Sequence, residues 1–152
     1  MKKNHIYLAV LLIATVGLTF LLSSIYNKEV NSFSYSYENL NKITSVEFEE
    51  YMMENTETII YISDKNDLRN NKFEKKFINK LENLNLLEKT IYIEKDELNN
   101  NFKELLKTNY NYKIDEKQLP IIIVIDSGEV VQNVIIDKNS NIDMVIDYGV
   151  FE

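Results

Sequence analysis

The stretch that decides the fold of this chain is Leu119-Pro120-Ile121-Ile122-Ile123-Val124-Ile125-Asp126-Ser127-Gly128-Glu129-Val130-Val131. It contains the only proline of the sequence and one of its three glycines. Five consecutive β-branched residues, Ile121 to Ile125, predict a strand that is buried on both faces. Asp126-Ser127-Gly128 predicts a tight turn, and the run from Glu129 to Ile136 predicts a second strand. The stretch therefore predicts an antiparallel hairpin, entered through a proline at the first strand position, where a missing N–H is tolerated.

Length and composition exclude several classes of protein. The chain has 152 residues, no cysteine and a net charge of -7. The acidic balance argues against nucleic-acid binding, because phosphate recognition needs a basic surface. The absence of cysteine excludes disulfides, thiol catalysis and cysteine-ligated metal sites. The part that follows residue 26 has the length of one domain with a sizeable core.

The N-terminal region predicts a membrane anchor. Residues 6–26 begin with an apolar run, Ile6 to Ile25, which has about the 20 residues that a bilayer-spanning helix needs. Lys2 and Lys3 precede it, so residues 1–5 are expected in the cytoplasm and the rest of the chain outside the cell membrane. The alternative is a cleaved signal peptide, although the apolar run is longer than is usual for one and no small-residue cleavage site follows.

Residues 27–42 are expected to form a polar stalk. Phe33, Tyr35 and Tyr37 alternate with serines there, and this period of two predicts a short strand. The strand would lie at the edge of the domain or in an ordered part of the stalk. Alternatively, its aromatic side would contact a partner or the lipid interface.

Residues 43–152 predict helices and strands in alternation. Three helices are expected: from a capping box at Thr44 and Glu47 to about Glu54, from Asn70 to Leu84, and from Glu97 to about Tyr110. A last helix is expected from Asn139 or Asn141 to Tyr148, where Gly149 would end it. Strands are expected from Thr58 to Ile62 and from Thr90 to Ile93, ahead of the hairpin. The inward positions of the first three helices are expected to be Val46, Tyr51 and Met52, then Phe73, Phe77, Leu81 and Leu84, then Leu98, Phe102, Leu105 and Leu106. Strands separated by helices imply parallel crossovers, and the hairpin adds an antiparallel strand, so the expected fold class is α/β with a mixed sheet between helices.

Two segments resemble the thioredoxin fold. The segment Leu119–Val131 resembles the family's proline-containing strand and turn, in which the proline is cis and flanks the active site. Thr58–Ile62 followed by Asn70–Phe77 resembles its first core strand and the helix that carries the Cys-x-x-Cys motif. An anchor followed by such a domain resembles the bacteriocin transport accessory proteins of Gram-positive bacteria. This resemblance implies a partner in a peptide export system.

The chain departs from that family at the position of its chemistry. Asp67-Leu68-Arg69-Asn70 stands where the family has Cys-x-x-Cys, and Leu119 precedes the proline where threonine is usual. Thiol–disulfide exchange requires a thiolate, which neither a carboxylate nor an amide replaces. The family's redox activity is therefore not expected here, and the sequence predicts neither an enzyme nor a bound cofactor.

Two other motifs contain residue types that are typical of binding sites. Asp67 is expected to cap the helix that follows it; the alternative is an anion or peptide-carboxylate site formed by Arg69 and free N–H groups. The run from Asp137 to Asp143 imitates a calcium loop, but Ile142 and Tyr148 occupy positions that need glycine and glutamate. No metal site is predicted, and this run is interpreted as a turn with a helix cap.

The expected function is peptide or protein binding in an apolar groove beside Pro120. Leu119 would face the groove, with Ser63 and Leu68 lining it, and an extended peptide would pair with its backbone by strand addition. The expected partners are this peptide or protein at the outer membrane face and the bilayer around the anchor, with no nucleic acid. The alternatives are a structural subunit of a membrane complex and an enzyme with non-thiol chemistry at Asp67 and Arg69.

Overall fold

The computed structural model describes residues 2–30, 33–137, 139–140 and 142, and within the first helix it describes the side chains of residues 7 and 10–25. The chain divides into two compact units, Met1–Ser32 and Phe33–Glu152.

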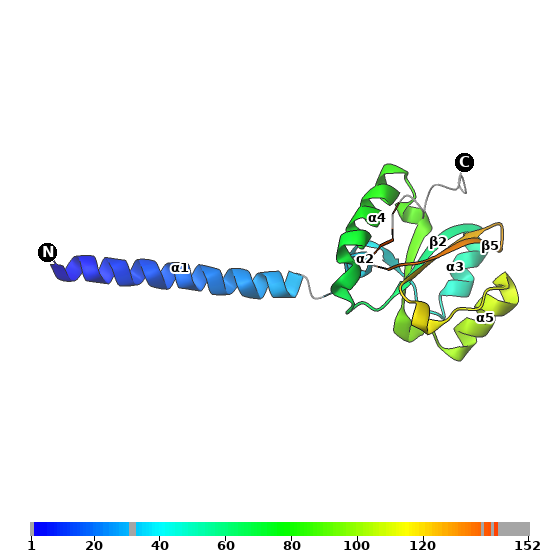
Figure 1. Ribbon diagram of the computed structural model, residues 1–152, viewed down its shortest axis with the longest axis horizontal. Helices are drawn as coiled ribbons and strands as arrows, with labels where there is room; N and C mark the ends of the chain where they lie inside the picture. Colours follow the sequence, from blue (N-terminus) through cyan, green and yellow to red (C-terminus); the bar gives the residue numbers. More distant parts are fainter. Residues whose placement is uncertain (1, 31–32, 138, 141, 143–152) are drawn as a thin grey trace. The chain divides into compact units, whose positions relative to one another are not determined.

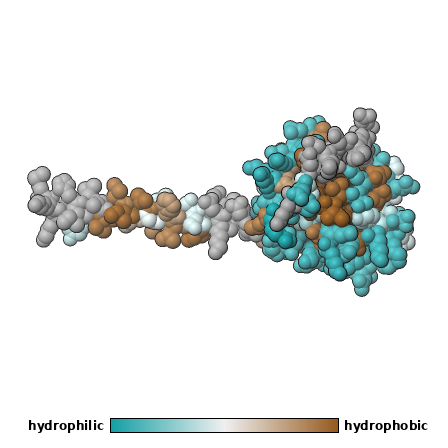
Figure 2. Space-filling view, in the orientation of Figure 1, coloured by the Kyte–Doolittle hydropathy of each residue, from teal (hydrophilic) through white to brown (hydrophobic). Residues whose placement is uncertain are grey.

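The first unit is a single helix, α1 (Lys2–Val30), drawn in blue in Figure 1. It extends beyond residue 26 into the segment that the sequence assigns to the stalk. Its large apolar side chains between Val10 and Ile25 are all exposed, from 53% for Val16 to 78% for Phe20, and they form the brown surface of the helix in Figure 2. Within the described part of the chain, no helix meets the combined length and apolarity that a membrane span requires.

The second unit is built on a five-stranded mixed sheet. Its strands are β1 (Asn41–Lys42), β2 (Glu57–Ser63), β3 (Thr90–Glu94), β4 (Ile121–Asp126) and β5 (Glu129–Ile135), in the spatial order β1-β3-β2-β4-β5. β3 runs parallel to both β1 and β2, whereas β4 runs antiparallel to both β2 and β5. The predicted mixed sheet and its terminal hairpin are confirmed.

The hairpin turn has the backbone that its residues predict. Ser127 and Gly128 both have positive φ, 51° and 82°, which is the requirement of a tight two-residue turn matched to the strand twist. β4 is buried along Ile121–Ile125, as expected, because β2 and β5 pair with its two edges and helices cover both faces. The Leu119–Pro120 bond is cis, and Pro120 lies one residue before the strand rather than at its first position.

Two pairs of helices cover the two faces of the sheet (Figure 1). On one face α3 (Phe48–Glu54) and α5 (Asn100–Tyr110) pack on strand residues such as Ile60, Ile91 and Ile123. On the other face α2 (Tyr35–Asn39) and α4 (Asn71–Asn83) pack on Tyr61, Tyr92 and Ile122. Each of these residues is adjacent in sequence to one of the three strand residues that face α3 and α5. Successive residues alternate between the faces because strand side chains have a period of two. Short 3₁₀ turns complete the domain: η1 (Leu68–Asn70), η2 (Leu87–Lys89), η3 (Lys95–Glu97) and η4 (Glu116–Gln118).

Two predicted helix faces need correction. The capping box forms, since Thr44 N–H donates to Glu47 Oε2 at 3.0 Å, but the helix begins at Phe48. Phe48 is therefore the buried residue, and Val46 is 86% exposed instead of inward. In α4, Leu84 lies beyond the last helical residue and is 46% exposed.

The strand predicted around Phe33, Tyr35 and Tyr37 is wrong, because Tyr35–Asn39 forms the helix α2. The adjacent serines are the buried residues. Ser34 N–H donates to the Lys65 carbonyl at 2.7 Å, and Ser36 N–H donates to Glu74 Oε2 at 2.8 Å. These partners lie about 30 residues or more along the chain, so tertiary contacts impose the helix on this short segment.

The segment after β5 begins with a turn, as interpreted from the sequence. Asp137 N–H donates to Ser140 Oγ at 2.8 Å, and Asp137 Oδ1 accepts from Asn139 N–H at 2.8 Å. The helix predicted up to Tyr148, with Gly149 at its end, lies outside the described residues.

Candidate functional site

A pocket of about 210 Å³ lies beside the cis Leu119–Pro120 bond. Three stretches of the chain contribute to its walls: residues 63–69, residue 95 and residues 116–120. The lining residues are Ser63, Asp64, Asp67, Arg69, Lys95, Glu116, Leu119 and Pro120. This pocket is called the Pro120 pocket below.

The sheet topology brings these segments together. β2 and β3 are parallel, and their last residues, Ser63 and Glu94, are paired. β4 runs antiparallel to β2, so its first residue, Ile121, pairs with Ile62 at the same end of the sheet. The chain therefore leaves β2 and β3, and enters β4, at the same edge of the sheet. The 3₁₀ turns η1, η3 and η4 lie in these connections, next to the strand ends.

Asp67 and Arg69 form a bidentate ion pair at one wall of the pocket. Arg69 Nε donates to Asp67 Oδ1, and Arg69 Nη2 donates to Asp67 Oδ2, each at 2.7 Å. The Asp67 side chain is only 13% exposed, whereas that of Arg69 is 81% exposed. The hydrogen bonds from the Arg69 side chain hold the pKa of Asp67 below its usual value, so Asp67 is a carboxylate at neutral pH.

Asp67 also acts as the predicted cap. Its Oδ1 accepts from the Arg69 backbone N–H at 3.1 Å. The capped element is the 3₁₀ turn η1, and α4 follows directly at Asn71. The Arg69 guanidinium is thus already paired, and a ligand anion at this wall would share it with Asp67.

The lining of the Pro120 pocket is mostly charged, which contradicts the apolar groove expected from the sequence. Lys95 Nζ lies 3.9 Å from Asp64 Oδ2, and Glu116 pairs with Lys103 of α5. Ser63 and Leu119 line the pocket, but Leu68 is 43% exposed and does not line it. Asn70 lines a second pocket, whose lining also includes Arg69. Three of the charged lining residues, Arg69, Lys95 and Glu116, belong to 3₁₀ turns next to the strand ends, and Asp64 and Asp67 lie between β2 and η1.

A buried carboxyl group, that of Glu74 in α4, was not predicted from the sequence. Glu74 is fully buried; its Oε1 accepts from the Tyr61 hydroxyl at 2.9 Å and its Oε2 from Ser36 N–H at 2.8 Å. Burial raises the pKa of Glu74. The sequence did carry a signal, because Glu74 precedes Ile78 by four residues and therefore lies on the apolar face of its helix.

A second buried tyrosine connects this region to the pocket wall. The Tyr92 hydroxyl donates to the carbonyl of Ser63 at 2.9 Å, and the rings of Tyr61 and Tyr92 lie 6.1 Å apart between centroids. Burial raises the pKa of Tyr92 above its ordinary range, so its hydroxyl remains a donor. Ser63, which lines the Pro120 pocket, is thereby fixed from the interior.

The chemistry that this arrangement offers is ion pairing and hydrogen bonding. The chain has no cysteine, and its single histidine, His5, lies outside the domain. Among the described residues, no group of three acidic or histidine side chains is placed to hold a metal ion. Asp67 is a poor proton donor at neutral pH because its pKa is lowered.

Comparison with known proteins identifies the fold. No protein-family model and no curated protein matches the sequence. Among solved structures, the chain is similar to a candidate oxidoreductase with a thioredoxin fold, with a TM-score of 0.53 and 16% identity over 74% of this chain and 96% of that one. It is also similar to a chain from a structure described as the structural basis of the thiol resolving mechanism in yeast mitochondrial 1-Cys peroxiredoxin via glutathione/thioredoxin systems, with a TM-score of 0.50 and 15% identity over 75% of this chain and 95% of that one. At these identities the likeness shows the fold alone: this is a chain with a thioredoxin-like fold that contains no cysteine.

Proposed function

We propose that the thioredoxin-like unit binds a peptide or protein segment at the Pro120 pocket and performs no thiol–disulfide chemistry. The observation that carries this proposal is the convergence of three stretches of the chain, from the ends of β2 and β3 and the start of β4, on one pocket in a protein without cysteine. A thiolate is indispensable for disulfide exchange, whereas ion pairs and backbone hydrogen bonds suffice for binding. The charged lining favours a ligand with polar or charged groups over a purely apolar one.

Photo-crosslinking in cells tests the binding surface. A photoreactive amino acid at Lys95, which is exposed and lines the Pro120 pocket, is expected to give defined adducts that mass spectrometry can identify. The control position is Leu84, which is 46% exposed and does not line the pocket. Adding Leu119→Asp should reduce the adduct yield from position 95 by about tenfold, since loss of one apolar contact of roughly 1.4 kcal/mol weakens binding by that factor.

The control position separates the proposal from its main alternative. Adducts of equal yield from Lys95 and Leu84, insensitive to Leu119→Asp, would indicate a subunit that is covered on several sides by a permanent partner. Complete absence of adducts from position 95 would contradict binding at the Pro120 pocket.

We further propose that α1 anchors the chain in the cell membrane with the thioredoxin-like unit outside. The support is the uncharged run Ile6 to Ile25 together with the exposure of its described side chains. A helix with apolar residues on all sides is unfavourable in water unless lipid or protein covers it. Lys2 and Lys3 favour a cytoplasmic N-terminus.

Protease accessibility measures this orientation. Trypsin added to intact, wall-stripped cells is expected to digest the thioredoxin-like unit, which contains most of the lysines, while a tag fused before Met1 stays protected. Protection of the unit would contradict the proposed orientation. Release of an untagged, soluble form into the medium would instead favour the cleaved signal peptide.

The partner is proposed to belong to a peptide or bacteriocin export system. This part of the proposal depends on the resemblance of an anchor followed by a thioredoxin-like domain to transport accessory proteins. The adducts from position 95 provide its test, because they identify the bound peptide or protein directly.

A further inference from the structure

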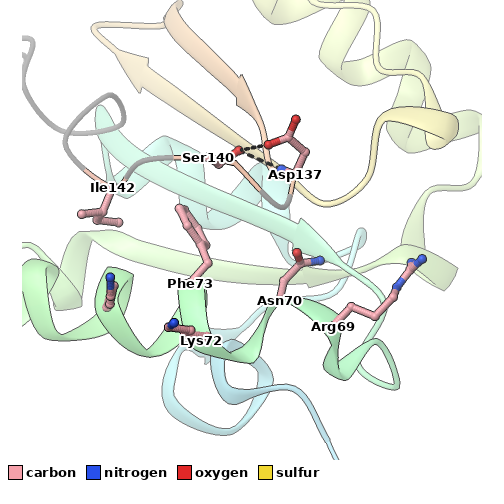
Figure 3. Close-up of a pocket in the computed structure, with 8 residues that line it drawn as sticks. Arg69, Asn70, Lys72, Phe73, Asp137, Ser140 and Ile142 are labelled. Carbon is pink, nitrogen blue, oxygen red and sulfur yellow. Dashed lines mark hydrogen bonds between the residues drawn. The ribbon is translucent and has the colours of Figure 1, made fainter.

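A second pocket, of about 330 Å³, shares Arg69 with the Pro120 pocket, and Figure 3 shows the residues that line it. It lies between the N-terminal half of α4 and the turn that follows β5. Its lining residues are Arg69, Asn70, Lys72, Phe73, Lys76, Asp137, Ser140 and Ile142. This pocket is called the lysine pocket below.

The lysine pocket carries excess positive charge in a chain whose net charge is -7. Lys72 and Lys76 are four residues apart on α4 and therefore share one side of the helix. Within the described part of the chain, neither of them has a carboxylate at ion-pair distance. Two lysines without such a partner in one concave site favour an anionic ligand.

The single lining carboxylate, Asp137, is already occupied by its own turn. Its Oδ1 accepts from Asn139 N–H at 2.8 Å and from Ser140 Oγ at 3.0 Å, and Figure 3 shows the second of these bonds beside the pocket. Asp137 therefore stabilises the turn, and it does not neutralise Lys72 or Lys76 by direct contact.

Part of the lining is apolar. Phe73 and Ile142 are partly buried against the core cluster that α4 covers, and Figure 3 shows both side chains at the pocket. A ligand that fills the pocket would place an anionic group near the lysines and an apolar group on Phe73 and Ile142. Arg69 lines both this pocket and the Pro120 pocket, so one extended ligand can pass over its side chain from one to the other.

We propose that the lysine pocket binds an acidic residue, with an apolar neighbour, of the same peptide segment that the Pro120 pocket holds. The proposal rests on the proposed function and defines its ligand as an acidic, partly apolar peptide. A peptide is favoured over a lipid surface because the lysines lie in a concavity with an apolar wall, whereas a flat bilayer surface would engage exposed lysines of α4 irrespective of the pocket.

Peptide pairs that differ only in charge test this inference. The full chain in a non-ionic detergent is titrated with pairs of fluorescent nine-residue peptides. The acidic member of a pair contains Asp and Glu beside Phe or Leu. The uncharged member has Asn and Gln in place of Asp and Glu. The acidic member of each pair is expected to bind about tenfold more tightly at low salt, since only its carboxylates can pair with Lys72 and Lys76. Added salt should reduce this preference.

Lysine variants assign the preference to the pocket. Lys72→Gln combined with Lys76→Gln should abolish the preference for acidic peptides while binding of the Asn/Gln peptides persists. Lys75→Gln is the matched control, because Lys75 is exposed on the same helix but does not line the pocket, and it should leave the preference unchanged.

The outcomes separate this inference from the proposed function. Equal binding of acidic and uncharged peptides would overturn the lysine pocket as an acidic subsite but leave peptide binding intact. If Lys75→Gln reduced the preference for acidic peptides as much as the double variant does, the charged surface would be diffuse, such as one that binds anionic lipid. That result would also overturn the lysine pocket as an acidic subsite. Binding of none of the peptides would overturn both proposals.

Discussion

An intramolecular disulfide is expected when Asp67→Cys is combined with Asn70→Cys. Asp67 caps η1 and Asn70 ends it, so the two positions are three residues apart across a 3₁₀ turn, where side chains at that spacing eclipse each other. A thiol at position 67 would also face Arg69, whose guanidinium now lies 2.7 Å from the Asp67 carboxylate and would lower the thiol pKa. The double variant should therefore oxidise under mild conditions and acquire weak insulin-reducing activity, whereas the natural chain should show none.

Mass spectrometry of the oxidised variant, before and after alkylation, measures the disulfide. The double variant Asp67→Ser with Asn70→Ser is the control for loss of the capping carboxylate, and Asp67→Cys alone should give only intermolecular disulfides. Failure of the Cys pair to close would show that positions 67 and 70 do not correspond to a redox motif. Insulin reduction by the natural chain would contradict the proposed absence of thiol chemistry.

Replacement of the buried carboxylate by Glu74→Ala is expected to destabilise the thioredoxin-like unit by about 3 kcal/mol. The substitution leaves Ser36 N–H and the Tyr61 hydroxyl, both fully buried, without their acceptor, and each unsatisfied buried donor costs roughly 1–3 kcal/mol. The variant no longer has to bury an ionisable carboxyl group, and this gain offsets part of the cost. Urea unfolding of the full chain in detergent, followed by the near-ultraviolet circular dichroism of the tyrosines, measures the change.

A matched control lies on the same helix. Glu82 is exposed, so Glu82→Ala should change the free energy of unfolding by no more than about 0.5 kcal/mol. The amide protons of α2 should also exchange faster with solvent in Glu74→Ala, since Ser36 N–H donates to Glu74. Equal stability of the Glu74→Ala and Glu82→Ala variants would contradict the role of Glu74 in holding α2.

The pH dependence of stability follows from the raised pKa of Glu74. The folded state binds the Glu74 proton more tightly than the unfolded state, whose ordinary value is 4.5. The resulting contribution to stability is fully present below that value and is lost as the pH rises through the raised pKa of the folded state. Glu74→Gln has no such titration, so the natural chain should gain stability relative to this variant as the pH is lowered.

Several features of the fold could be predicted from sequence because they depend on local patterns. Five β-branched residues predicted the buried strand β4, and Asp126-Ser127-Gly128 predicted the turn to β5. The apolar spacing of Phe77 and Leu81 predicted the inner face of α4. The absence of cysteine, which excludes thiol chemistry, is likewise a property of the sequence alone.

The candidate site could be predicted only in part. Asp67, Arg69, Leu119 and Pro120 were singled out from sequence, and they line one pocket because β2 and β4 meet at the same end of the sheet. Lys95 and Glu116 were missed, since the 3₁₀ turns that carry them have no distinctive pattern. Their charges make the pocket polar where the sequence had suggested an apolar groove.

The sequence by itself determined the hairpin, the amphipathic helices and the lack of a sulfur nucleophile, because each depends on residues that are close together in the chain. The tertiary structure decided the conformation of Tyr35–Asn39, the burial of Glu74 and the composition of both pockets. The alternation of serines and aromatic residues is compatible with a strand. The helix prevails because Lys65 and Glu74, about 30 residues or more away, accept the hydrogen bonds of Ser34 and Ser36. A periodic pattern contains no information about such distant acceptors, and a buried donor must be satisfied wherever its acceptor lies.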